Sequence, residues 1–204
     1  MKRDEVREQT EEGARAGHGP DDRRDGTCAA PGARMQRISD ALELLTAQHD
    51  EIEALIAEIA DTVNPDRRAQ AITELADRLT VHLAAEQVLF YPAVSMLISR
   101  EVHQELLAEH AEIKRVLADL LWLEGEDMRL ERKLASLKAL MDIHATWQER
   151  ELFETVAETR SAEELVALGT EITAWVDSII DASANAAASA AVSGGSMVST
   201  SVAA

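Results

Sequence analysis

Residues 79–92 read LTVHLAAEQVLFYP, and this stretch places His82 and Glu86 four residues apart among apolar residues and strong helix formers. On an α-helix each residue advances about 100°, so these two side chains lie on one face, one turn apart. Burying an imidazole and a carboxylate costs free energy unless the groups are paired or bind a cation. The stretch therefore indicates a polar site inside a helical core.

Three more histidines, His49, His110 and His144, each lie on the apolar side of another helical segment. Successive members of the set are 33, 28 and 34 residues apart, which is near the length of one helix plus its turn. Four long segments with short connections predict an all-α fold, an antiparallel up-down-up-down four-helix bundle. In such a bundle all four imidazoles are expected at a similar height in the core.

The expected helices have recognisable starts and stops. They cover residues of about 39–63, 65–96, 100–123 and 127–159, with a shorter fifth helix over about 161–180. Ser39 is the expected N-cap of the first helix, Asn64-Pro65 opens the second, and Ser161-Ala162-Glu163-Glu164 reads as a capping box. Pro92 predicts a kink or break near Phe90–Tyr91. The bundle is expected over 36–182, between disordered tails at 1–35 and 183–204. Met35 directly precedes the first periodic segment and is a hypothetical alternative start of translation.

Composition excludes several classes of function. The net charge of −18 argues against binding nucleic acid, whose phosphates need Lys and Arg. Cys28 is the one cysteine, so a disulfide framework and cysteine-based zinc or iron–sulfur sites are excluded. No apolar run reaches the roughly 18–20 residues that span a bilayer, and the N-terminus lacks an apolar leader. A cytoplasmic protein is therefore the expectation.

The second and fourth segments carry a partial echo, HLAAEQVLF and HATWQERELF. Aligned at Leu-Phe, Glu86 and Glu149 occupy the same place, but His144 stands five residues before Glu149, about 140° round a regular helix. Gln148 takes the four-apart position. Glu149 would therefore need a favourable helix rotation, a long reach or a widened turn to join the site.

Imidazole and carboxylate together suit iron, zinc or manganese. The Glu-x-x-His motif of ferritin-like proteins is absent, because the residues three before His82, His103, His110 and His144 are Leu79, Arg100, Leu107 and Met141. The metal type stays open at this point.

The full set of motifs is AQHDEI, HLAAEQVLFYP, EHAEIK and HATWQERELF, and it resembles the hemerythrin-like family, also called the HHE cation-binding domain, over residues 38–158. The resemblance implies a non-haem di-iron centre bridged by two carboxylates, Glu86 and Glu149. The implied metal ligands are His49, His82, Glu86, His110, His144 and Glu149.

Two positions depart from the oxygen-carrying relatives. Leu106 stands where those proteins have a second histidine on the third helix, and Gln148 stands where many relatives have Glu. His103 is two turns before His110, roughly 10 Å away along the axis. This set is one ligand short of the oxygen carriers, and it is compatible with a water-filled position, with a single ion in place of two, or with a substitute ligand. Tyr91 is expected either as a hydrogen-bond donor to the site or as an aromatic side chain that caps the end of the bundle.

The expected function is binding or sensing of a small ligand such as oxygen, peroxide or nitric oxide at iron. A second hypothesis is an enzyme that consumes peroxide or nitric oxide, although no dedicated acid, base or substrate pocket is identifiable. A metal-regulated interaction protein, whose protein partner is unknown, is a third hypothesis, and a metal-free bundle is a fourth.

Overall fold

The computed structural model describes residues 40–123 and 128–194, with side chains described through residue 186. Every regular element among these residues is helical. Their bounds are α1 Ala41–Asp61, α2 Pro65–Ala85, the π-helix η1 Glu86–Phe90, α3 Tyr91–Ala93, α4 Arg100–Leu121, α5 Met128–Trp147, the π-helix η2 Gln148–Leu152, α6 Phe153–Thr159 and α7 Ala162–Gly194. The predicted N-terminal tail over 1–35, which includes Met35, lies outside the described residues, and so does Ser39, the expected cap of the first helix.

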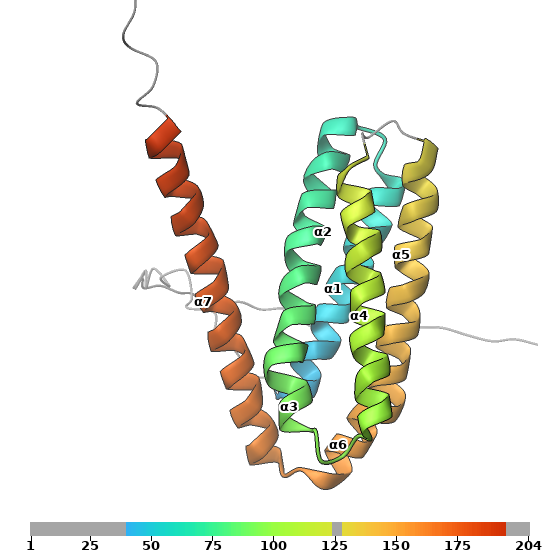
Figure 1. Ribbon diagram of the computed structural model, residues 1–204, viewed down its shortest axis with the longest axis vertical. Helices are drawn as coiled ribbons and strands as arrows, with labels where there is room; N and C mark the ends of the chain where they lie inside the picture. The colour runs from blue at the N-terminus through green and yellow to red at the C-terminus, as the bar shows by residue number, and fades with distance from the viewer. Residues whose placement is uncertain (1–39, 124–127, 195–204) are drawn as a thin grey trace, which may run out of the picture. The chain divides into compact units, whose positions relative to one another are not determined.

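Four long helices, α1, α2, α4 and α5, lie side by side (Figure 1). The pairs α1–α2, α2–α4, α4–α5 and α1–α5 are all in contact, so the four helices surround a common interior. The α1–α2 connection lies at one end of the group, and the connection between α3 and α4 lies at the other (Figure 1). The all-helical class predicted from the sequence is confirmed for the described residues.

Helix α1 begins one residue later than predicted. The carboxylate Oδ1 of Asp40 accepts hydrogen bonds from the N–H groups of Leu42 and Glu43, at 2.9 Å each. Asp40 is therefore the N-cap, and the assignment of Ser39 to this place is wrong. A carboxylate here also lies favourably at the positive end of the helix dipole.

Two other predicted helix starts are confirmed. Asn64 caps α2 by accepting the N–H of Arg67 at 2.9 Å, with Pro65 at the first helical position. At α7, Ser161 Oγ accepts the N–H of Glu164 at 3.2 Å, while the Glu164 carboxylate accepts the N–H of Ser161 at 2.8 Å. This reciprocal pair is the predicted capping box.

Two helix ends differ from the prediction. The second helix leaves regular α geometry at Glu86, before the expected kink, and ends at Ala93 rather than near 96. Helix α7 was expected to end near Ile180 but continues to Gly194 through a run of alanines, the residue with the highest helix propensity. Residues 183–194, predicted to be disordered, are thus helical.

Helix α7 packs against α1, α2 and η1 through its first half. Leu165 and Ile172 are buried there, whereas every side chain from 181 to 186 is exposed. Among the described residues, no helix has the length and apolar character needed to cross a membrane.

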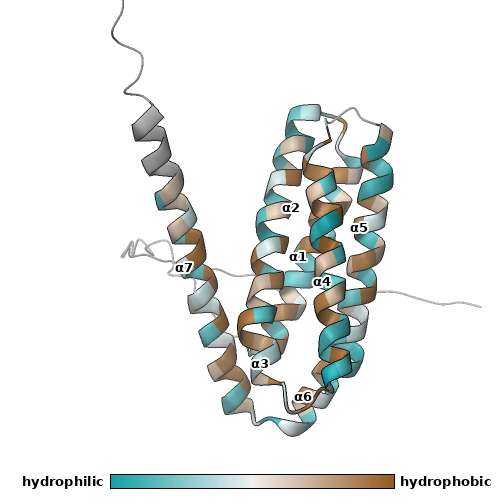
Figure 2. Ribbon diagram, viewed as in Figure 1, coloured by the Kyte–Doolittle hydropathy of each residue, from teal (hydrophilic) through white to brown (hydrophobic). Residues whose placement is uncertain are grey.

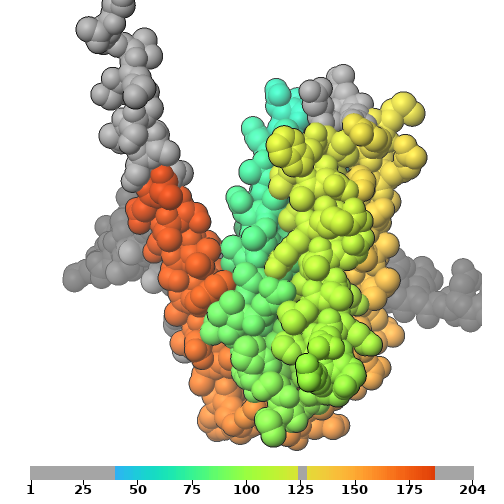
Figure 3. All heavy atoms as spheres, in the orientation of Figure 1, coloured from blue at the N-terminus to red at the C-terminus, as the bar shows by residue number. Residues whose placement is uncertain are grey.

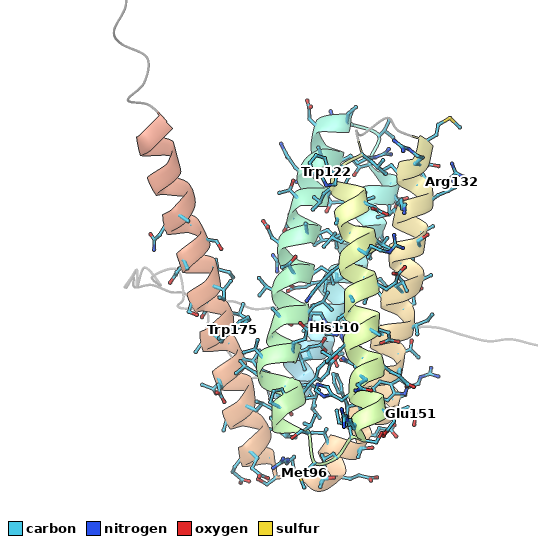
Figure 4. The ribbon with its side chains drawn as sticks, viewed as in Figure 1. Met96, His110, Trp122, Arg132, Glu151 and Trp175 are labelled. Carbon is cyan, nitrogen blue, oxygen red and sulfur yellow. The ribbon has the colours of Figure 1, made fainter. Side chains whose placement is uncertain are left out.

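The buried apolar residues form two clusters, and the polar site lies between them. On α1, Leu45 belongs to one cluster and Ile52 to the other, with His49 between; on α4, Leu106 and Ile113 flank His110 in the same way. Hydrophilic and hydrophobic residues alternate around these helices (Figure 2), and the side chain of His110 lies in the interior (Figure 4). The apolar packing therefore holds the histidines at one level of the core.

Candidate metal centre

Each of the two π-helices begins at a fully buried polar residue. Glu86 opens η1, where the N–H of Tyr91 bonds to the carbonyl of Glu86, and Gln148 opens η2 in the same manner with Phe153. Pro92 explains part of η1, since it lacks an N–H and its ring clashes with the carbonyl four residues earlier. The second π-helix is the widened turn that the five-residue spacing of His144 and Glu149 made one option.

Four predicted ligands meet in the core. His49, His82, Glu86 and His144 each offer one ligand atom, and these atoms all lie within 4.8 Å of one another. The ring centroids are 4.8 Å apart for His49 and His82, 5.5 Å for His49 and His144, and 5.9 Å for His82 and His144. The four side chains are 5%, 1%, 0% and 0% exposed, so water does not solvate them.

The carboxylate of Glu86 is the centre of this cluster. Its Oε2 lies 3.1 Å from Nε2 of His110, 3.3 Å from Nε2 of His144 and 3.6 Å from Nε2 of His82. Burial disfavours the charge on Glu86, but the neighbouring His82 and His144 outweigh burial and hold its pKa well below the usual range. Glu86 is therefore a carboxylate at neutral pH.

The same charge separates the pKa values of two neighbouring histidines. Burial lowers the pKa of His82 to about 3, despite the attraction of Glu86. Burial also opposes protonation of His144, yet Glu86, with help from Glu109, raises the pKa of His144 to about 9. Burial lowers the pKa of His49. The cluster thus combines neutral imidazoles, which are good metal ligands, with one imidazolium.

Three of the histidines have an oxygen on the outer side of the ring. Nδ1 of His49 lies 2.8 Å from Oε1 of Glu149, and Nδ1 of His82 lies 2.9 Å from Oε1 of Gln48. Nδ1 of His144 lies 3.6 Å from Oε2 of Glu109. Because carboxylate and amide oxygens accept, Nδ1 of His49 and of His82 carries the proton and leaves Nε2 free.

Those inner nitrogens have no hydrogen-bond partner. Within the described part of the chain, Nε2 of His49, His82 and His144 and Oε1 of Glu86 are buried without one. Buried polar atoms are nearly always paired, so four unpaired atoms around one point need an explanation. An outer acceptor on Nδ1 with a free Nε2 facing inward is the usual arrangement of a metal-binding histidine.

A second hydrogen-bonded group adjoins Glu86. The side chain Nε2 of Gln148 donates to the hydroxyl of Tyr91 at 2.7 Å, and that hydroxyl lies 2.9 Å from Nε2 of His110 and 3.5 Å from Oε2 of Glu86. Burial, together with the charge of Glu86, raises the pKa of Tyr91. Tyr91 therefore stays a neutral phenol, and of its two expected roles the structure supports the hydrogen-bond donor.

The remaining expected residues are placed differently. Glu149 does not enter the four-atom group but bonds to the outer nitrogen of His49, with 37% of its side chain exposed. His103 is half-buried, with its ring 6.1 Å from that of Tyr91, and Leu106 is buried. The acceptors Gln48 and Glu109 were not identified from the sequence, because each serves a histidine on another helix and no pattern along the chain marks that pairing.

The residues present fit an iron ion. Imidazole nitrogens and carboxylate oxygens bind iron well, and this cluster offers three unpaired Nε2 atoms beside an ionised carboxylate. The same donors also suit zinc or manganese.

Comparison with known proteins agrees with this centre. A sequence model of the hemerythrin HHE cation binding domain matches residues 40–156, which is more than half of the chain. The chain therefore belongs to the hemerythrin HHE cation-binding family. A crystal structure of a hemerythrin HHE cation binding domain-containing protein from Mycobacterium kansasii is 27% identical, has a TM-score of 0.61, and aligns with 69% of this chain and 86% of that one.

A more distant relative is a protein of Nostoc sp. strain PCC 7120 named DNA nickase. It is 23% identical over 132 residues, which are 65% of this chain but 38% of that protein. The present chain thus spans less than half of that relative.

Proposed function

We propose that this protein is a hemerythrin-like, non-haem iron-binding protein that binds or senses a small ligand such as oxygen, peroxide or nitric oxide. The carrying observation is the set of unpaired Nε2 atoms of His49, His82 and His144 around the buried carboxylate of Glu86. In this proposal the four long helices form an antiparallel up-down-up-down bundle, and the metal-binding function is the reason for its polar interior.

The proposed ligands differ in how far each side chain would have to move to bind a metal ion. His49, His82 and His144 already present Nε2 toward Glu86, so they need no rearrangement to bind. His110 reaches the cluster through Glu86, 3.1 Å away, and Glu149 reaches it through His49. Two ions would be held by all six ligands, whereas a single ion would be held by the three histidines and Glu86 alone.

Fe(II) with an open coordination position binds oxygen, peroxide or nitric oxide. The residues that would line the small-ligand site are one buried polar pair and one buried apolar side chain. Tyr91 and Gln148 are both fully buried next to Glu86, and the phenol can donate a hydrogen bond to a bound anion. Leu106, 3% exposed, supplies no ligand where oxygen-carrying relatives have histidine. The pair Tyr91 and Gln148 would orient the small ligand while the apolar surroundings exclude water.

Binding or sensing is favoured over turnover, because no described residue in the core is poised as a general base apart from the ligands themselves. An oxygen-evolution assay with added peroxide separates the two cases. The DNA-nicking activity named for the Nostoc relative is not part of the proposal, since the shared region is 38% of that protein and this chain carries a net charge of −18.

The test is to load metal-free protein with Fe(II) without air and then to admit air. We expect retained iron and charge-transfer absorption of ferric iron in the near ultraviolet. His82→Ala should lose most of this iron, whereas the control variant His103→Ala, which removes a histidine outside the cluster, should retain it. Wild-type protein that retains no iron after loading would refute the proposal.

A further inference from the structure

A groove of about 440 Å³ lies on the surface between α1 and α5. Its outer walls carry Asp50 and Glu53 from α1 and Lys138 and Asp142 from α5, while His49 and Glu149 lie in its lining as well. His49 is also a member of the metal cluster. One side chain therefore belongs both to a surface groove and to the buried centre.

We propose that this groove is the entrance through which divalent cations reach the centre, with Glu149 as the first of the proposed metal ligands that they meet. The inference rests on the proposed iron site and adds how that site is filled. Glu149 is 37% exposed on its side chain, whereas His49, 5% exposed, already belongs to the interior. Since Glu149 bonds to His49 at 2.8 Å, an ion held by this carboxylate is one side chain away from the cluster.

The other proposed ligands offer no comparable access. His82, Glu86, His110 and His144 are all 0–1% exposed. On the face seen in Figure 3, the side chains of α2 and α4 close over the interior. Access by way of α1 and α5 is thus the path on which the described residues combine a hollow in the surface with an exposed ligand.

The charges along the groove suit a cation. Asp50, Glu53, Asp142 and Glu149 contribute four carboxylates against the single ammonium of Lys138. Clefts lined by one sign of charge raise the local concentration and the association rate of the opposite ion. A neutral ligand such as oxygen would gain nothing from this arrangement, so the groove favours the metal rather than the small ligand.

The positive charge of Lys138 repels an entering cation, so removing it should change the rate of metal loading in the opposite direction to removing a carboxylate. Its ammonium extends from α5 to Oε1 of Glu53 on α1 at 3.3 Å, and it lies 2.7 Å from Oδ1 of Asp142. It therefore bridges the two walls and neutralises part of their charge. Removing either carboxylate should slow metal loading, and removing Lys138 should accelerate it.

The experiment mixes Co(II) with metal-free full-length protein at low ionic strength and follows the visible d–d absorption in a stopped-flow instrument. A unit charge about 8 Å from a divalent ion in water changes the association rate by about fivefold. We expect Glu53→Gln and Asp142→Asn each to slow loading by about this factor and Lys138→Gln to accelerate it similarly. All three should bind the wild-type amount of Co(II) at saturation, and added salt should reduce the differences.

A matched pair of controls lies at the seam between α4 and α5, where Lys133 bonds to Asp119 at 2.5 Å. Asp119→Asn and Lys133→Gln make the same changes in net charge away from the groove, so they should leave the loading rate nearly unchanged. Groove variants that load at the rate of these controls would overturn the entrance while leaving the iron site intact. Wild-type protein that binds no Co(II) at saturation would instead overturn the iron site, and the entrance with it.

Discussion

The Glu86→Gln substitution should change the number of protons that metal binding releases. Nε2 of His144 lies 3.3 Å from Oε2 of Glu86, and this carboxylate overcomes the effect of burial to raise the pKa of His144 to about 9. A metal ion must displace that proton before it can bind Nε2. Glutamine has nearly the same shape but no charge, so only Glu109 would then oppose the effect of burial, and the pKa of His144 should fall from about 9.

The magnitude follows from the pKa values. At pH 7 a group with a pKa of about 9 is roughly 99% protonated, so binding should release about one proton from His144. His49 and His82, whose pKa values are lowered by burial, are already neutral and release none. Affinity should therefore rise about tenfold per pH unit between pH 7 and 9. In Glu86→Gln, the release from His144 should be smaller than in the wild type, because the main attraction that keeps the imidazolium protonated is gone.

The assay is calorimetric titration with Zn(II), a redox-inert probe, in buffers with different heats of ionisation at pH 7. The dependence of the observed heat on the buffer gives the number of protons released. His103→Ala serves as the control and should match the wild type. Equal release by wild type and Glu86→Gln, or no release by the wild type, would refute the assigned coupling between Glu86 and His144.

Three further predictions concern affinity and stability. Gln48→Ala removes the acceptor of Nδ1 of His82 and should weaken Zn(II) binding by about 10–100-fold in an equilibrium titration; unchanged affinity would contradict the role of Gln48. Removing metal with a chelator should lower Tm by roughly 5–10 °C in a thermal scan, because an ion at 100 times its Kd stabilises the fold by about 2.7 kcal/mol. Leu75→Ala, at a fully buried position in the apolar cluster away from the site, should cost about 3 kcal/mol of unfolding free energy while the metal stoichiometry stays constant; a change in stoichiometry would show that the core and the centre are coupled.

Much of the fold could be predicted because its signals are local. The Asn64-Pro65 start of α2 and the capping box at Ser161 depend on residues within one turn, and both are confirmed. Asp40 replaced Ser39 as the first cap because adjacent residues of similar capping ability cannot be separated by pattern alone. The alanines after Ile180 favour a longer α7, but the sequence alone does not fix the residue at which that helix ends.

For the candidate site, the sequence predicts which helices supply the histidines and that these lie at one height, but not the hydrogen-bond partners of each side chain. The spacing of the histidines places them at one height, and the structure brings three of them and Glu86 together, with His110 in contact through Glu86. The partners Gln48 and Tyr91 depend on how each helix is rotated about its axis, which a single sequence does not determine. The widening at η2 likewise has no proline to mark it.

Anomalous X-ray scattering at the iron edge would locate an iron ion held beside Glu86 by imidazoles from separate helices. Crystals of protein loaded with Fe(II) should show an anomalous peak in bonding contact, roughly 2.0–2.2 Å, with Nε2 of His49, His82 or His144 and with an oxygen of Glu86. Loaded crystals with no anomalous peak among these side chains, or with iron confined to the surface groove, would contradict the account.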